Sequence, residues 1–133
     1  MNSKSLKKYG FGEWYAFSIA NKEKILNILP YKKGVYILKY NSLVYRLKGK
    51  SDILYIGKTI SGLNYRINFY FNPGPSQETS KRINSYLKNK KFGNLKISFK
   101  VMISKDRTRE LEKKLLCRYD NDHEELPPWN RSA

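Results

Sequence analysis

The sequence predicts an α+β fold in which a small antiparallel β-sheet of about three strands is flanked by α-helices. Three strand-like segments are joined by short turns, which favours antiparallel pairing. Segments with helical periodicity precede and follow them, so helices are available to cover the sheet. The chain has 133 residues, of which 40% are hydrophobic. This is enough for one packed core, and residues 1–133 are predicted to form a single domain.

The first 30 residues are interpreted as an N-terminal helical extension. Residues 1–20 show no clear periodicity. Residues 21–29 are expected to form a helix with Asn21 as its N-cap. Pro30 follows directly and is expected to end this helix.

The central segments alternate between strand and turn patterns. Residues 34–40 and 53–57 are rich in β-branched and aromatic side chains, which is typical of strands. Residues 43–47 are left open as a further strand, before the turn signal at residues 49–52. Residues 95–103 alternate between apolar and polar side chains, as a strand with one buried face does.

Two helices are predicted between these strands. Residues 62–71 have an apolar inner side, and a loop rich in proline and glycine follows them. Residues 80–91 form a basic helix, which is expected to be capped by Thr79 or Ser80 and ended by Gly93.

Positive charge is the most distinctive property of the composition. The chain has 27 Lys and Arg residues against 11 Asp and Glu residues, which gives a formal net charge of +16. Residues 32–100 contain fifteen of these cations and only two acids, whereas residues 106–125 contain seven acids. Tyrosines are interleaved with the cations: Tyr31, Tyr36, Tyr40, Tyr45, Tyr55, Tyr65, Tyr70 and Tyr86. Such a surface is expected to bind a polyanion, with nucleic acid as the first candidate and an anionic membrane surface as the second.

Several functional classes are excluded by the sequence. No apolar run approaches the length of about 20 residues that spans a bilayer. The single cysteine, Cys117, cannot form an intramolecular disulfide, and with one histidine, His123, it cannot supply a structural zinc site. The Gly-Lys-Ser/Thr tripeptides at 49–51 and 57–59 lack the earlier glycine of a P-loop, so no nucleotide cofactor is expected. The chain is interpreted as intracellular and cytoplasmic, and His123 is expected to be solvated.

A carboxylate stands out in the last predicted helix, residues 106–119. Glu112 falls near the middle of the apolar stripe of this helix, whereas Glu110 points to the opposite side. The stripe is formed by Leu111, Leu115, Leu116 and Tyr119. A carboxylate in this position is costly unless a cation meets it. Glu112 is therefore either a ligand of a divalent metal or one half of a structural ion pair with Arg or Lys.

An arginine stands out in the helix predicted at residues 62–71. Arg66 lies beside the apolar stripe, and Tyr70 lies one turn further on the same side. An arginine that is held by a rigid helix can neutralise a phosphate. The alternative is an ordinary surface arginine.

Five short motifs, in order, resemble the motif series of the GIY-YIG nuclease superfamily. They are Gly34-Val35-Tyr36, Tyr55-Ile56-Gly57-Lys58-Thr59, Arg66, Leu111-Glu112-x-x-Leu115-Leu116 and Pro128-Trp129-Asn130. The chain is more similar to compact stand-alone enzymes of phage and restriction type than to modules of large proteins. Tyr36 and Tyr55 lie 19 residues apart, which is wider than the family commonly shows, and residues 41–51 fill the gap. Glu112 and Asn130 are also unusually far apart.

The resemblance implies a GIY-YIG-like fold, with a catalytic core at residues 34–130, and a metal-dependent endodeoxyribonuclease. It implies one Mg²⁺ per active site, which Mn²⁺ can replace, with Glu112 as the sole protein ligand. The implied catalytic residues are Tyr36, Tyr55, Lys58, Arg66, Tyr70, Glu112 and Asn130. The implied DNA-binding residues are Lys58, Arg66, Lys81 and Arg82, where solvated surface is the alternative for Lys81 and Arg82.

The implied roles follow the chemistry of each side chain. Tyr36 takes a proton from the attacking water or orients that water. Because a free tyrosine has a pKa of about 10, it is expected to need Lys58, the metal or a relay to act as a base. Tyr55 orients water or phosphate, and Tyr70 shares this task or is a core tyrosine. Asn130 binds the neighbouring backbone or holds the site closed.

Three functions remain open at this point. The first is a DNA endonuclease that cuts both strands with some sequence specificity and acts as a homodimer or homotetramer. Its biological role is then restriction, degradation of host DNA by a phage, or the activity of a mobile element. Specificity is then expected from residues 41–51, residues 72–79 and the basic helix. The second is a non-catalytic DNA-binding module on the same scaffold. The third is a protein that binds RNA or an anionic membrane without cleavage.

Overall fold

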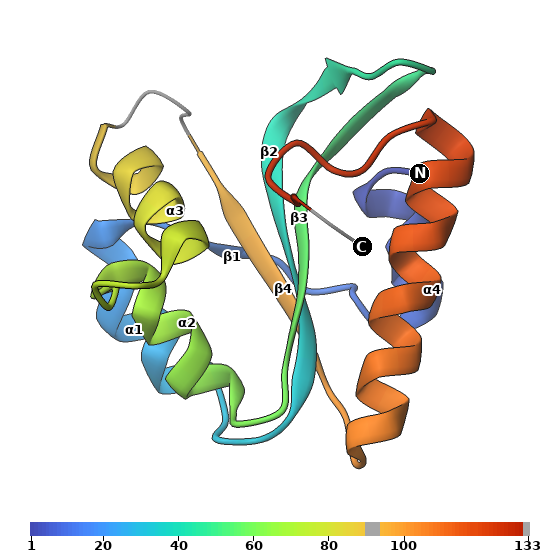
Figure 1. Cartoon of the computed structure of the whole chain (residues 1–133). Helices are drawn as coiled ribbons and strands as arrows, with labels where there is room; N and C mark the ends of the chain where they lie inside the picture. Colours follow the sequence, from blue (N-terminus) through green and yellow to red (C-terminus); the bar gives the residue numbers. More distant parts are fainter. Residues whose placement is uncertain (90–93, 132–133) are drawn as a thin grey trace.

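The computed structural model describes residues 1–89 and 94–131. Figure 1 shows a β-sheet that stands between two groups of helices. None of the helices in the described residues is long and apolar enough to cross a membrane. The elements follow one another as the 3₁₀ helix η1 (Ser3–Tyr9), β1 (Tyr15–Ala16), the 3₁₀ helix η2 (Ile19–Asn21), α1 (Lys22–Ile28), β2 (Gly34–Tyr45), β3 (Lys50–Thr59), α2 (Leu63–Phe71), α3 (Glu78–Asn89), β4 (Lys96–Val101) and α4 (Lys105–His123).

The sheet is antiparallel and has the strand order β1-β4-β2-β3, so β3 forms one edge. The predicted antiparallel α+β architecture is confirmed. The expected number of about three strands is corrected to four, because residues 15–16 add a two-residue strand beside β4. The segments expected at 34–40 and 43–47 are one continuous strand, β2. Register shifts on both sides of Lys39 interrupt its pairing with β3 without ending the strand.

The two faces of the sheet carry separate hydrophobic clusters. Tyr36 and Leu38 of β2 face α1, α2 and α3, whereas Val35 and Ile37 face α4 and η1. This alternation is the ordinary two-residue period of a strand. Because the sheet ends at β3, side chains from both faces can approach the same edge.

The N-terminal segment is more than the predicted helical extension. It contributes β1 to the sheet, and the buried side chains of Leu6 and Phe11 belong to the cluster under α4. Asn21 precedes α1 as expected, but its side chain donates to the carbonyl of Ala16 and does not cap the helix. The short turn before α1 is capped instead by Ser18.

The later helices differ from their predicted bounds at the ends. α3 begins at Glu78, so Thr79 and Ser80 lie inside it, and the expected end at Gly93 lies outside the described residues. α4 continues four residues beyond the predicted Tyr119 to His123. His123 is buried, and its Nδ1 lies 2.7 Å from the carbonyl oxygen of Lys48, so the expectation of a solvated histidine is wrong.

Candidate active site

Three tyrosines that are far apart in the sequence form one cluster on the face that α2 covers. Ring centroids are 6.0 Å apart for Tyr36 and Tyr55, 6.0 Å for Tyr36 and Tyr70, and 6.5 Å for Tyr55 and Tyr70. The hydroxyl groups of Tyr36 and Tyr70 share a hydrogen bond. Tyr36 and Tyr70 are fully buried, whereas Tyr55 is partly exposed. Of the three, Tyr55 therefore has access to solvent.

The glycines of the two tyrosine motifs permit this packing. Gly57 lies opposite Tyr36 in the β2–β3 register. A Cβ atom on Gly57 would lie 2.6 Å from Cζ of Tyr36 and 2.6 Å from Cε2 of Tyr55. A Cβ atom on Gly34 would lie 2.6 Å from the main-chain oxygen of Lys100. Both positions need a residue without a side chain because another group approaches the backbone closely.

Arg66 extends this cluster from α2. Its Cζ lies 5.0 Å from the ring centroid of Tyr70, and its Nη1 donates a 3.1 Å hydrogen bond to Oγ of Ser80. Burial alone would lower the pKa of Arg66, but the hydroxyls of Tyr36 and Tyr70 offset this and raise it. Arg66 forms no ion pair with any carboxylate in residues 1–89 and 94–131. Its positive charge is thus held in place without a counter-ion from these residues.

Glu112 and Lys58 meet on the opposite face of the sheet. Nζ of Lys58 lies 2.9 Å from Oε1 of Glu112, and the exposed fractions of the two side chains are 34% and 17%. The partly buried carboxylate in the apolar stripe of α4 is therefore met by a lysine. No hydrogen bond or ion pair to Oε2 of Glu112 occurs within the described part of the chain.

The donor set around Glu112 fits a largely hydrated Mg²⁺. No group of three or more His, Cys, Asp or Glu side chains that could hold a metal occurs among the described residues. A single carboxylate with a free oxygen suits Mg²⁺, which keeps several waters and often binds through one or two carboxylates. A zinc-type cage of protein ligands does not fit this site.

Lys58, one of the groups expected to help Tyr36 act as a base, lies on the other face of the sheet from Tyr36. Lys58 lies opposite Val35 in the register, on the side of α4, whereas Tyr36 points to the side of α2. Burial raises the pKa of Tyr36 above its usual value, and nearby Tyr55 adds to this effect. A phenol in this environment is a poor proton acceptor at neutral pH, so proton transfer to Tyr36 is disfavoured and the other predicted role, orientation of the attacking water, remains.

The raised pKa of Tyr36 predicts a loss of stability at high pH. Below pH 10 the phenol is neutral in both the folded and the unfolded chain. Above pH 10 the unfolded chain ionises first, so the free energy of unfolding falls by up to about 1.4 kcal/mol per pH unit for this residue. Urea unfolding at pH 9 to 11.5 is expected to show a shallower decline in Tyr36→Phe than in the unchanged protein. Tyr45→Phe, at an exposed tyrosine, is the control, and equal slopes in all three proteins contradict the prediction.

Asn130 sits on the open edge of β3. Its Nδ2 donates to the carbonyl of Ile56 at 2.9 Å, and its Oδ1 accepts from the amide of Ile56 at 3.0 Å. The amide of Trp129 also donates to the carbonyl of Leu54, at 2.9 Å. In Figure 1 the C-terminal segment crosses in front of β3. Asn130 thus binds the backbone beside Tyr55, and the last turns of α4 with the following loop span the long interval from Glu112.

The two cations expected to grip DNA from the basic helix differ in their surroundings. Lys81 is exposed, and its Nζ lies 4.0 Å from Glu78. Arg82 is partly buried, and its Nη2 donates to the carbonyl of Trp129. Arg82 therefore holds the C-terminal segment through Nη2, and its contact with DNA stays a prediction.

The comparisons with known proteins bear on the fold. No family model matches the chain, and no curated protein does. The N-terminal endonuclease domain of UvrC from Thermotoga maritima, bound to its catalytic magnesium, matches with a TM-score of 0.54 and 24% identity over 83% of this chain and 96% of that chain. Two point mutants of this domain with the divalent cation bound match with a TM-score of 0.55 and 22% identity over 84% of this chain and 97% of theirs. This chain has the GIY-YIG endonuclease fold.

The GIY-YIG fold accounts for how the predicted residues are distributed. Tyr36, Tyr55, Arg66 and Tyr70 gather on one face of β3, Lys58 and Glu112 on the other, and Asn130 at its edge. Sequence reasoning missed Ser80 as the partner of Arg66. The signal was present, because Ser80, Ile83, Asn84 and Leu87 follow helical spacing. A polar residue in such a buried stripe needs a hydrogen-bonding partner.

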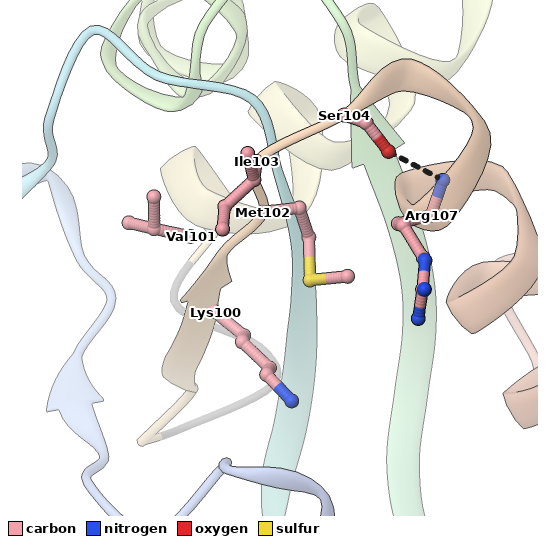
Figure 2. Close-up of a pocket in the computed structure, with 6 residues that line it drawn as sticks. All are labelled: Lys100, Val101, Met102, Ile103, Ser104 and Arg107. Carbon is pink, nitrogen blue, oxygen red and sulfur yellow. Dashed lines mark hydrogen bonds between the residues drawn. The ribbon is translucent and has the colours of Figure 1, made fainter.

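A pocket of about 560 Å³ lies elsewhere on this GIY-YIG fold, between the end of β4 and the start of α4. Figure 2 shows Lys100 and Arg107 on two sides of the Met102 side chain. Oγ of Ser104 accepts a 3.1 Å hydrogen bond from the amide of Arg107 and so caps α4. None of the predicted site residues lines this pocket.

Proposed function

We propose that this protein is a metal-dependent DNA endonuclease that hydrolyses phosphodiester bonds. The observation that carries the proposal is the presence of two groups, Arg66 on one face of the sheet and Glu112 on the other. Arg66 supplies a fixed cation that pairs with no carboxylate of residues 1–89 and 94–131, and Glu112 supplies a carboxylate whose Oε2 has no partner among the same residues. Hydrolysis of a phosphodiester requires both: a cation that neutralises the charge of the phosphate, and a carboxylate that holds the metal ion. The endonuclease domains with a catalytic divalent cation that share the fold support this assignment.

Glu112 is the residue that would hold the metal, with Mg²⁺ as the natural ion and Mn²⁺ as a substitute. When bound, the ion would stabilise negative charge on the scissile phosphate and on the leaving oxygen. Lys58 occupies one oxygen of Glu112 through their 2.9 Å contact. Near a DNA phosphate, the ammonium group of Lys58 can exchange this carboxylate for a phosphate oxygen.

The other residues bind and orient the substrate. Arg66 neutralises the scissile phosphate with a guanidinium that is already in position. Tyr55, the partly exposed member of the tyrosine cluster, orients water or phosphate through its hydroxyl. The buried pair Tyr36 and Tyr70, whose hydroxyls share a hydrogen bond, packs against Arg66 and Tyr55 and holds them in position. Asn130 keeps the C-terminal segment on the edge of β3.

The substrate is double-stranded DNA in this proposal. The net charge of +16 favours a nucleic-acid backbone, and exposed Lys81 extends the basic surface beyond the site. Cutting two strands with one site per chain requires two chains, so we propose a homodimer or homotetramer. Sequence specificity is assigned to residues 41–51, residues 72–79 and α3. The proposed setting is the cytoplasm, and the proposed role is restriction or degradation of host DNA by a phage or another mobile element.

Cleavage of a supercoiled plasmid tests the proposal. The purified protein is expected to convert the plasmid to nicked and linear forms with Mg²⁺ or Mn²⁺, and to leave it intact with EDTA. Discrete fragments on longer DNA support a restriction-like enzyme, whereas a smear supports a degrading enzyme of low specificity. DNA binding without cleavage in either metal, on several DNAs, overturns the proposal and favours a non-catalytic DNA-binding module.

A further inference from the structure

The inner face of α3 carries two buried polar residues. Ser80 is fully buried and Asn84 is 6% exposed, and both lie in the stripe that also contains Ile83 and Leu87. Buried polar groups are retained where they have hydrogen-bonding partners. Both of these residues direct their side chains to α2, the helix that carries Arg66.

Asn84 fixes the end of α2. Its Nδ2 donates to the carbonyl of Tyr70 at 2.9 Å and to the carbonyl of Phe71 at 3.1 Å. These carbonyls belong to the last turn of the helix, where no intrahelical partner is available. The backbone of α2 is therefore anchored to α3 four residues after Arg66.

Ser80 fixes the side chain of Arg66. Its Oγ accepts the 3.1 Å hydrogen bond from Nη1, while the ring of Tyr70 lies 5.0 Å from Cζ. One contact holds an edge of the guanidinium and the other holds a face, so together they define the orientation of a planar group. The hydroxyl of a serine does this without negative charge. A carboxylate in its place would bind Arg66 more strongly, but it would also cancel the charge that a phosphate needs.

We propose that Ser80 is a positioning residue, which orients Arg66 toward the scissile phosphate while leaving its charge uncompensated. This inference rests on the proposed function. Ser80 lies outside the five sequence motifs and would be an additional residue on which cleavage depends. The basic helix α3 would then orient Arg66 in addition to contacting DNA. The neutral hydroxyl is the essential property, because both removal of the contact and addition of charge are expected to impair the site.

Three substitutions at Ser80 separate these two effects. Ser80→Ala removes the contact and is expected to lower kcat about tenfold with a KM within about twofold, because misplacement of a catalytic group affects the chemical step. Ser80→Thr keeps a hydroxyl and is expected to restore kcat to within about threefold. Ser80→Asp is expected to lower kcat about 100-fold, although the ion pair holds Arg66 more firmly. Ser85→Ala, at an exposed serine of the same helix, is the control and is expected to match the unchanged protein.

A second readout does not depend on cleavage. In ¹⁵N spectra of the arginine side chains, the two Nη groups of Arg66 are expected to give separate signals because the contact with Ser80 slows rotation of the guanidinium. Ser80→Ala is expected to merge them, and Ser85→Ala is not. Merged signals in the unchanged protein, or equal kcat in Ser80→Ala and Ser85→Ala, overturn the inference. If the unchanged protein cleaves no DNA, the proposed function fails, and the spectra still decide whether Ser80 orients Arg66.

Discussion

Replacing Glu112 by glutamine is expected to lower the rate of Mg²⁺-dependent DNA cleavage by about 1,000-fold. This corresponds to about 4 kcal/mol of transition-state stabilisation, the scale expected for a metal that neutralises a phosphate. Glutamine keeps the shape of the side chain, and its amide oxygen still accepts the hydrogen bond from Lys58 that occurs at 2.9 Å in this structure. The substitution therefore removes the negative charge while leaving the packing of α4 in place.

The measurement is a single-turnover cleavage assay together with a calorimetric titration of Mg²⁺. Loss of cleavage is expected to accompany loss of metal binding in Glu112→Gln. Glu110→Gln is the matched control, because Glu110 is an exposed glutamate on the other side of the same helix. Unchanged cleavage in Glu112→Gln, or equal loss in both variants, would show that the metal is not held at Glu112.

Much of the fold could be predicted from local patterns. β-branched and aromatic runs indicated β2 and β3, the alternation of apolar and polar side chains indicated β4, and the apolar stripe indicated α4. β1 could not be predicted because a strand of two residues, Tyr15–Ala16, has no periodicity of its own. The sequence pattern also did not predict that residues 34–45 form a single strand. Exposed residues at positions 41–43 break the alternation there, although the backbone remains extended across the register shifts at Lys39.

The partners of the site residues were the part that local patterns left open. The helical stripe showed that Glu112 needs a cation, but the choice of Lys58 depends on the register of β3. That register shifts at Leu54, because Tyr55 pairs with Leu38 whereas Ile53 pairs with Lys39. Leu54 and Tyr55 therefore belong to the same hydrophobic cluster, although adjacent residues of a regular strand face opposite sides of the sheet. The shift lies before Tyr55, so the two-residue period still holds from Tyr55 to Lys58 and puts these two side chains on opposite faces. What this period alone could not give is the pairing of β3 with β2, which sets Gly57 opposite Tyr36 and Lys58 opposite Val35.

Replacing Arg66 by alanine is expected to lower kcat by about 100- to 1,000-fold, the range for loss of one preorganised electrostatic group. Arg66 has no carboxylate partner in the described residues, so its removal leaves no buried charge behind and the fold is expected to persist. Arg66→Lys keeps the charge but loses the planar fork. It is expected to remain at least about tenfold below the unchanged protein in kcat.

These two substitutions distinguish charge from orientation, because the site offers Arg66 one edge contact at Ser80 and one face contact at Tyr70. A lysine ammonium is not planar, so the contacts with Ser80 and Tyr70 cannot orient it as they orient a guanidinium. Full activity in Arg66→Lys would therefore show that charge alone suffices. Added guanidinium is expected to restore part of the activity of Arg66→Ala, since the space between Tyr70 and Ser80 remains. Arg109→Ala, at an exposed arginine of α4, is the control for the loss of one positive charge. If it impairs cleavage as strongly as Arg66→Ala, the effect reflects overall attraction of DNA, and the assignment of Arg66 to the reacting phosphate is wrong.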